Sequence, residues 1–281
     1  MKIACFFNQS PGTIGEYFRH AFANLGHRVD QVNTAQADQC QDGYDLYLRV
    51  DHGDYVHDLP ERLHPRAFYV VDAHLARSWK SIQRQAARYD IVFCAQQSAA
   101  QRLARAHWVP MGCDPEIHGP RGDGPIRYDV AFVGNDGGIP RKLLLQEMRE
   151  RYPHSFIGRA PYTQMARIYH EAKIGFHYIE CTSPLQDMVS MRVYEVLASG
   201  TMLLANKLPD GTFEAVGFQN RREMVWYRSP QELFELLQYY LTHESEREAI
   251  ARAGHQSVMA KHTYRHRAEQ MVALLQKELG L

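Results

Sequence analysis

The sequence predicts an α/β protein with two parallel-sheet domains and a helical C-terminal tail. Short apolar runs alternate with longer helical patterns, the alternation breaks at residues 118–127 and then starts again, and the last part of the chain is nearly all helical. Buried parallel strands give continuous apolar runs because helices cover both faces of their sheet. The chain has 281 residues, and two cores are expected because single cores stop growing at about 250 to 300 residues.

The first domain is expected to span residues 1–120. It opens with a βαβ unit, in which a helix carrying Phe18 and Phe22 on one face joins two strands. Its predicted strands are 2–7, 28–33, 44–50, 67–72 and 89–95, and its later helices are about 74–88 and 96–106. We expect these strands to form one Rossmann-like parallel sheet.

The second domain is expected to span residues 126–281, after a linker rich in Gly, Pro and charge at 118–127. Its predicted strands are 128–134, 154–158, 173–179 and 201–206, and its helices are about 140–152, 162–172 and 190–199. The helical tail follows, and we expect its last helix to pack back on the first domain.

The amino-acid composition limits the classes of partner that this protein is expected to bind. Lys plus Arg and Asp plus Glu both total 32, so no net field recruits nucleic acid or an anionic membrane. The sequence contains no apolar run of about 18 residues and no signal-peptide pattern, which predicts a cytoplasmic protein without a transmembrane segment. The five cysteines form no CxxC pair, as expected of reduced thiols.

The functional site is expected in a cleft between the two domains. Open parallel sheets bind ligands beyond the carboxyl ends of their strands, and two such sheets that face each other form a cleft there.

A short helix of the second domain is flanked by signals for both of its ends. Ser190 is the expected N-cap, and Gly200 stands where a left-handed residue would end the helix. Asp187 precedes this helix and Glu195 lies inside it. The free N–H groups at a helix start bind phosphate, and a carboxylate nearby can accept hydrogen bonds from vicinal hydroxyls. These features suit a ligand with both a diphosphate and sugars.

A simpler interpretation of the two acids stays open. Asp187 would only compensate the helix dipole, and Glu195 would only pair with Arg192 on the helix surface.

A basic turn also points to an anion. The strand that ends near Gly134 leads through a Gly-rich loop to a helix with Arg141 and Lys142 in its first turn. Cations oppose the dipole there unless an anion lies between them. The alternative is a solvated basic turn. Neither the P-loop pattern nor GxGxxG is present, so a P-loop NTPase and a dinucleotide-binding dehydrogenase are not supported.

In the first domain, Asp72 and His74 follow a predicted strand and are candidates for the site; the alternative is a helix cap with a surface histidine. A second cluster, with Asp51, His52, Asp54 and His57, has metal-ligand types. Donor-rich spacing alone is weak evidence, so we expect no metal site.

Residues 65–278 resemble the CgeB-type glycosyltransferases, which belong to the GT-B enzymes that use nucleotide-sugar donors. The stretches that carry the resemblance are WVPMGCDPEIHGP, YDVAFVG followed by PRK, FIGRAPYTQM, MRVYEVLASG followed by TMLLAN, and HTYRHRAEQMVALL. The resemblance implies a GT-B-like fold and a nucleotide diphosphosugar donor, with no further cofactor and no metal.

The resemblance also implies roles for individual residues. Related retaining enzymes pair an acidic residue with a Glu across seven intervening residues, here Asp187 and Glu195. Glu195 would bind the nucleotide ribose and Asp187 would lie near the donor sugar, where Asp replaces the commoner Glu. For the diphosphate, the resemblance implies backbone N–H groups near Val189 and Ser190 and the side chain of Arg141, with Lys142 in second place. It implies Arg159 and Tyr162 for the base and His74 for the sugar.

The expected reaction is glycosyl transfer, with retention as the first expectation. An inverting reaction would need a base such as Asp72, His74 or His52. Two other functions remain: a nucleotide-sugar epimerase of the same fold, and a catalytically silent nucleotide- or partner-binding module. The sequence identifies neither the sugar nor the acceptor.

Overall fold

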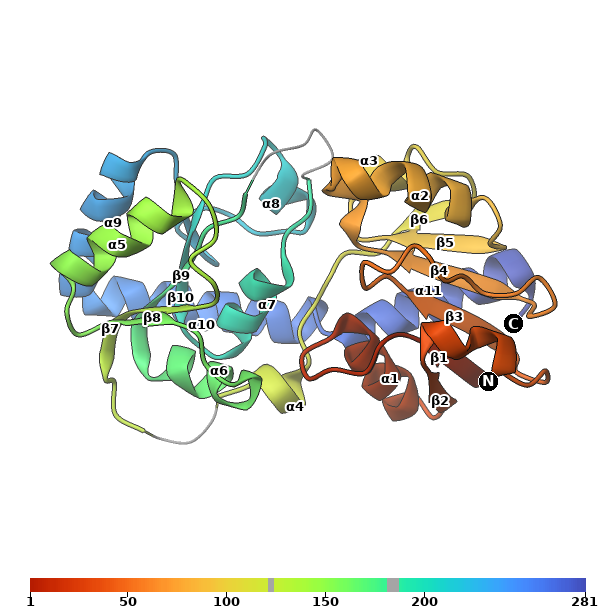
Figure 1. Ribbon diagram of the computed structural model, residues 1–281. Coiled ribbons are helices and arrows are strands. Elements are labelled where there is room, and N and C mark those ends of the chain that lie inside the picture. The colour runs from red at the N-terminus through yellow and green to blue at the C-terminus, as the bar shows by residue number, and fades with distance from the viewer. Residues whose placement is uncertain (121–123, 181–186) are drawn as a thin grey trace. The chain divides into compact units, whose positions relative to one another are not determined.

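The computed structural model describes residues 1–120, 124–180 and 187–281. The chain divides into two compact units. Unit 1 comprises Met1–Met111, Cys181–Met188 and Tyr264–Leu281, and unit 2 comprises Gly112–Glu180 and Val189–Thr263. Each unit is built on one parallel sheet (Figure 1). The prediction of two parallel-sheet α/β domains is therefore confirmed.

The sheet of unit 1 has the strand order β2-β1-β3-β4-β5-β6. Its strands are β1 (Lys2–Phe6), β2 (Arg28–Val32), β3 (Leu46–Val50), β4 (Arg66–Val70), β5 (Ile91–Cys94) and β6 (Ala106–Trp108). Its helices are α1 (Ile14–Asn24), α2 (Ala76–Ala86), α3 (Gln97–Ala100) and α11 (Tyr264–Leu279), with short 3-10 turns at Thr34–Gln39 and Asp72–His74.

Successive strand residues point to opposite faces of this sheet. Helices cover both faces. On one face, Phe18 of α1 packs edge-on against Tyr69 of β4 and Tyr264 of α11, with ring centroids 4.7 and 5.1 Å apart. On the other face, Ile82 of α2 packs with Phe68. Helix α11 runs beside α1 (Figure 1), so the end of the chain completes the core of unit 1.

The sheet of unit 2 has the strand order β11-β10-β9-β7-β8. Its strands are β7 (Tyr128–Val133), β8 (Phe156–Gly158), β9 (Ala172–His177), β10 (Met202–Asn206) and β11 (Val225–Tyr227). Its helices are α4 (Pro115–His118), α5 (Arg141–Arg151), α6 (Tyr162–His170), α7 (Met191–Ala198), α8 (Thr212–Ala215), α9 (Pro230–Thr242) and α10 (Glu244–Lys261).

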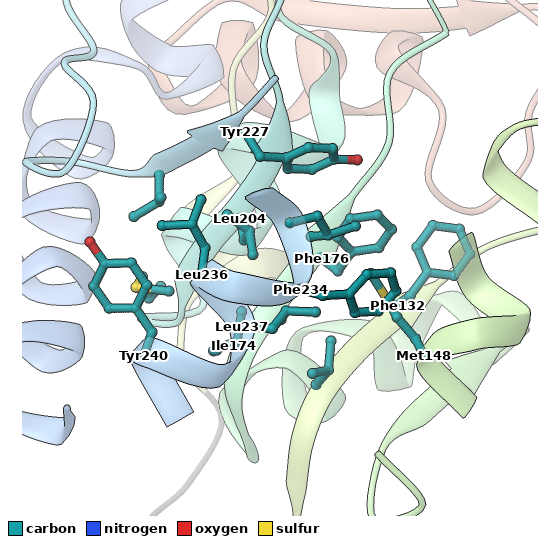
Figure 2. Packing of buried hydrophobic residues seen from close by; sticks show 14 of the residues in the cluster. Phe132, Met148, Ile174, Phe176, Leu204, Tyr227, Phe234, Leu236, Leu237 and Tyr240 are labelled. Atoms are coloured by element: carbon teal, nitrogen blue, oxygen red, sulfur yellow. The ribbon is translucent and has the colours of Figure 1, made fainter. Parts of the chain in front are cut away.

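The core of unit 2 joins one face of the sheet to α5, α9 and α10. Figure 2 shows Phe132, Phe176 and Leu204 from the strands packed with Met148 and Phe234 from the helices. On the opposite face, a Cβ at Gly175 would overlap Val196 of α7 and would also contact Tyr169 of α6. A glycine in β9 therefore lets α6 and α7 lie close to the sheet.

Short elements, among them α4, β6, α8 and β11, were not predicted from the sequence. The helix predicted at 96–106 is only α3, and the chain then enters β6, which pairs in parallel with β5. Arg105 has a φ of 55°, a left-handed conformation that is incompatible with continuing a helix. Strand β11 was not predicted, because its short apolar run has no period that separates it from a loop. Gly200 has a φ of 82°, which confirms its predicted left-handed conformation after α7.

Cys5, Cys40, Cys94 and Cys113 are buried, and the fifth cysteine, Cys181, lies outside the described residues. Within residues 1–120, 124–180 and 187–281, no helix is long and apolar enough to span a membrane.

Candidate functional site

Unit 2 contains a pocket of about 430 Å³ beyond the carboxyl ends of β7 and β8. Three predicted site residues, Gly134, Arg159 and Tyr162, lie together in its wall. The other lining residues are Val133, Asn135, Ala160, Met165 and Arg192. The loops after both strands contribute, which is the usual place for a ligand in a parallel α/β sheet.

A hydrogen bond ties these two loops together. The Nε of Arg159 donates to Oδ1 of Asn135, which links the loop after β8 to the loop after β7. Asn135 was not predicted as a site residue, because an exposed Asn in a Gly-rich loop is typical of any turn.

Glu195 lies behind the wall of this pocket, and its side chain is only 1% exposed. The Nη1 of Arg192 is 2.6 Å from Oε2 of Glu195, and Nε2 of His118 is 3.3 Å from Oε1. Burial raises the pKa of Glu195, but the charge of Arg192 outweighs that effect and lowers the pKa. The carboxylate is thus ionised at neutral pH and is covered by its neighbours.

The proton position on His118 follows from its backbone contact. The backbone N–H of Asp114 donates to Nδ1 of His118 over 2.9 Å. A ring nitrogen that accepts a hydrogen bond carries no proton, so the proton of His118 is on Nε2 and the ring is neutral. Nε2 lies 2.5 Å from the hydroxyl of Tyr162, and both burial and the charge of Glu195 raise the pKa of Tyr162.

The N-terminus of α7 lies near the end of β9. Ser190 is the N-cap residue, as predicted, but its hydroxyl does not cap the helix and instead lies 2.8 Å from Nε2 of His177. Val189, which precedes it, is buried. Burial lowers the pKa of His177 to about 3, with further contributions from the charges of Arg192 and Arg141. Both arginines therefore act on the same corner of the sheet.

Arg141 is the first residue of α5, as predicted, and is partly paired by its own chain. Its Nη2 lies 3.4 Å from Oε1 of Glu180, and its Nε donates to the carbonyl of Asp136 over 3.1 Å. A Cβ at Gly137 would occupy the space of the guanidinium, so the glycine makes room for this side chain. Lys142 is exposed.

Three other predicted residues belong to unit 1. Asp187, the expected partner of Glu195, accepts hydrogen bonds from the backbone N–H and the hydroxyl of Ser98 at 2.7 and 2.8 Å. His74 has its Nδ1 3.3 Å from Nε2 of Gln96, and burial lowers its pKa.

Asp72, the third of these residues, lies beside a carboxylate that is already satisfied. Asp51 accepts hydrogen bonds from Tyr55 Oη and from the backbone N–H groups of Gly53, Val71 and Asp72, at 3.0 to 3.1 Å. Burial and the charge of Asp51 raise the pKa of Asp72 to about 6. A carboxyl with such a pKa can take up or release a proton near neutral pH.

The cluster considered for metal binding has other contacts. His52 lies 2.9 Å from the hydroxyl of Thr34, and Asp54 lies 2.8 Å from Nδ1 of His57 and caps two backbone N–H groups. Among the described residues, no group of three or more His, Cys, Asp or Glu side chains could hold a metal ion.

Besides Asn135, His118 and Arg192 were not assigned a function from the sequence. His118 falls in the segment predicted as a linker, and its only local signal is the N-cap pattern of Asp114 and Pro115 that begins α4. Arg192 was considered only as a surface partner of Glu195. Its helical spacing predicted the ion pair, but neither its burial nor its place in the pocket wall.

Comparisons with known proteins identify one matching family model and several solved structures with a similar fold. A family model described as glycosyl transferase-like matches residues 115–273, more than half of the chain. No curated protein matches the sequence.

Several solved structures share the fold. Anabaena HepE in complex with UDP and glucose has a TM-score of 0.70 and 10% identity, over 99% of this chain and 100% of that chain. A glycosyltransferase from Rickettsia africae has a TM-score of 0.65 and 9% identity, over 99% and 98%. A putative UDP-N-acetylglucosamine 2-epimerase from Listeria monocytogenes has a TM-score of 0.58 and 10% identity, over 99% and 96%. At such identities the likeness concerns the fold, which is GT-B-like. Together with the family match, it makes this chain a member of the glycosyl transferase-like family and, as predicted, a glycosyltransferase.

Proposed function

We propose that this protein transfers a sugar from a nucleotide diphosphosugar to an acceptor hydroxyl with retention of anomeric configuration. The observation that carries the proposal is the convergence, in unit 2, of the 430 Å³ pocket with Arg192 and the N-terminus of α7. HepE, which has a similar fold, was solved with UDP and glucose and also with UDP-glucose. These complexes make UDP-sugars the first donors to test.

The donor is assigned to unit 2 in two parts. The wall with Gly134, Arg159 and Tyr162 takes the base, because it combines an aromatic ring with polar edges. Arg141, the backbone N–H groups at Val189 and Ser190 and, more peripherally, Lys142 take the diphosphate. Glu195 is assigned to the ribose end of this donor site and Asp187 to the sugar, as the resemblance to CgeB-type enzymes implies.

The chemical step breaks the bond between the anomeric carbon and the β-phosphate oxygen and forms a bond from that carbon to the acceptor oxygen. The acceptor proton passes to the departing phosphate oxygen, so that a nucleoside diphosphate leaves. The negative charge on the diphosphate grows in the transition state. The cations and the α7 N-terminus therefore stabilise the transition state more than the ground state.

The acceptor is assigned to unit 1 beside Asp72, which follows β4, and His74 is assigned to the donor sugar, as the resemblance implies. In the retaining reaction Asp72 binds the acceptor hydroxyl and needs no proton transfer. An inverting reaction would use Asp72 as the base, which its pKa of about 6 permits. The anomeric configuration of the product, read by NMR, distinguishes the two reactions.

The proposal is tested by turnover. Wild-type protein is incubated with UDP-, GDP-, ADP- and dTDP-sugars, with and without candidate acceptors, and release of nucleoside diphosphate is measured. Arg141→Ala is expected to lower the rate by about 100-fold, the effect of removing one electrostatic group from a transition state. Glu195→Ala is also expected to lower the rate, because the donor site loses a residue assigned to the ribose end. Near wild-type rates in both variants would rule out this site.

We also propose that transfer proceeds without a metal ion, since arginines and a helix terminus can neutralise the diphosphate. Turnover is expected to be unchanged by EDTA. Loss of turnover with EDTA and recovery with Mg²⁺ or Mn²⁺ would contradict this part of the proposal.

A second candidate function is nucleotide-sugar epimerisation, which is favoured by the similar fold of the Listeria protein. An epimerase would convert the sugar of its donor without any acceptor. NMR of the nucleotide sugar after incubation with the protein alone would show a new epimer in that case, and an unchanged sugar if the protein is a transferase.

A further inference from the structure

The side chain that connects Glu195 to the pocket is Arg192. Glu195 is 1% exposed and does not line the pocket, whereas Arg192 is 24% exposed and does. The two residues are three apart on α7, so one face of the helix presents both. A ligand in this pocket, with the protein in this conformation, meets Arg192 and not the carboxylate of Glu195.

The network formed by Glu195, Arg192, His118 and Tyr162 contains one anion and one cation. His118 is neutral, because its Nδ1 accepts the backbone N–H of Asp114. Tyr162 is neutral because its pKa is raised. Glu195 therefore serves as the buried counter-ion of Arg192, and the network around it also fixes the hydroxyl of Tyr162.

Only part of the guanidinium is used by this network. Nη1 of Arg192 donates to Glu195 and contacts the sulfur of Met165. Within the described part of the chain, Nε and Nη2 of Arg192 make no hydrogen bond. The donors of a guanidinium form a rigid fork, so a carboxylate that holds one nitrogen also fixes the direction of the others.

A further anion would be stabilised at the position of Arg192. A cation in the first turn of a helix opposes the helix dipole, and Arg141 is a second cation that acts on His177 at the same corner. Glu195 contacts Arg192, and Glu180 contacts Arg141. Each glutamate is therefore neutralised by its own arginine and does not neutralise the positive end of α7. A phosphate group on the pocket side would meet the free edge of Arg192 and the positive end of α7 together.

We propose that Arg192 binds a phosphate of the donor directly and that Glu195 is a positioning residue, which acts by holding and orienting Arg192. The inference rests on the proposed function and changes the way in which Glu195 serves it. If Glu195 instead accepted hydrogen bonds from the ribose, its effect would not depend on the phosphates.

The test compares ligands with and without phosphates. Isothermal titration calorimetry measures the affinity of UDP, GDP, ADP and dTDP and of the matching nucleosides for wild-type protein, and the tightest pair is carried forward. Arg192→Met is expected to weaken the diphosphate by about 10- to 100-fold, the range for a charged hydrogen bond. It is expected to change the affinity for the nucleoside by less than about threefold. Glu195→Gln should show the same pattern, and the double variant should bind no worse than Arg192→Met.

Controls separate this effect from misfolding and from general charge. Arg167→Met removes an arginine of α6 that is 56% exposed and outside the pocket, and it should leave both affinities unchanged. Thermal unfolding is measured first, because Arg192→Met leaves Glu195 without its cation. Arg192→Lys keeps the charge and loses the fork, so it should weaken the diphosphate selectively even if the Met variant does not fold.

Two results would overturn the inference. One is a loss of nucleoside affinity in Glu195→Gln as large as the loss of diphosphate affinity, which would mean direct contact with the ribose. The other is an unchanged ratio of diphosphate to nucleoside affinity in both Arg192 variants, which would leave the proposed function intact. Failure of all these ligands to bind wild-type protein would remove both proposals.

Discussion

The carboxylate of Asp187 accepts two hydrogen bonds from Ser98, one from the backbone N–H at 2.7 Å and one from the hydroxyl at 2.8 Å. Ser98 lies in the first turn of α3, where backbone N–H groups have no partner within the helix. Asp187 therefore satisfies a helix start that is 89 residues away in the sequence. The same residue is the one expected near the donor sugar, so its structural and chemical roles must be separated.

Asp187→Ala is expected to lower the free energy of unfolding by about 1 kcal/mol, the usual cost of losing a helix cap. Asp187→Asn should retain much of this stability, because an amide oxygen still accepts from the Ser98 N–H. Urea denaturation measures both. Ser98→Ala is the matched control, since it removes one hydrogen bond and keeps the carboxylate. If Asp187→Asn abolishes turnover while Ser98→Ala has full turnover, the carboxylate acts on the substrate as well.

Stability at neutral pH is expected to rise when Asp72 is replaced by Asn. The pKa of Asp72 is raised from 3.8 to about 6 in the folded protein, so ionisation favours the unfolded chain. The stability associated with the protonated form is present below the unfolded pKa and is lost as the pH rises through 6. The free energy of unfolding of Asp72→Asn should therefore be higher than that of the wild type by about 3 kcal/mol at pH 7.5. The difference should shrink toward pH 4, and a difference independent of pH would contradict the assignment.

Gly137 is expected to be required for diphosphate binding through the space it leaves for Arg141. Gly137 has a φ of 67°, and a Cβ there would overlap the guanidinium. Gly137→Ala should strain the turn and displace Arg141, which reduces the affinity for a nucleoside diphosphate by about tenfold. The neighbouring Gly138 has open space around it, so Gly138→Ala serves as the control in the same titration. Equal affinities in the two variants would show that Arg141 does not contact the phosphates.

The loop after β3 is expected to depend on a buried ion pair. Arg49 has a fully buried side chain, and its Nη1 lies 3.0 Å from Oδ1 of Asp58. Asp58→Ala would leave Arg49 buried without a counter-ion, and the free energy of unfolding should fall by about 3 to 5 kcal/mol.

The matched control for this pair is Glu61→Ala. Glu61 is 81% exposed and lies 3.5 Å from Arg88, so its loss should change stability by less than about 0.5 kcal/mol. Guanidinium denaturation monitored by tryptophan fluorescence checks both variants. Similar effects of the two substitutions would mean that burial does not decide the strength of the Asp58 contact.

Local sequence patterns predicted the alternation of strands and helices and the start and end of α7. Continuous apolar runs and a glycine in a left-handed conformation act within a few residues, so they can be recognised without knowledge of the fold. The same local rules placed Gly134, Arg159 and Tyr162 on loops that follow strands or begin helices. The short strands β6 and β11 were not predicted, because each is held by pairing with a neighbouring strand and not by a sequence pattern of its own.

Which side chains of the site meet depends on how whole elements pack together, and local patterns did not predict it. Helical spacing predicted that Arg192 pairs with Glu195, but burial decided that the arginine faces the pocket and the carboxylate lies behind it. His118 and Tyr162 are 44 residues apart, and the backbone N–H of Asp114 fixes the proton that joins them. Contacts of this kind depend on the packing of whole helices against a sheet, which no stretch of sequence encodes locally.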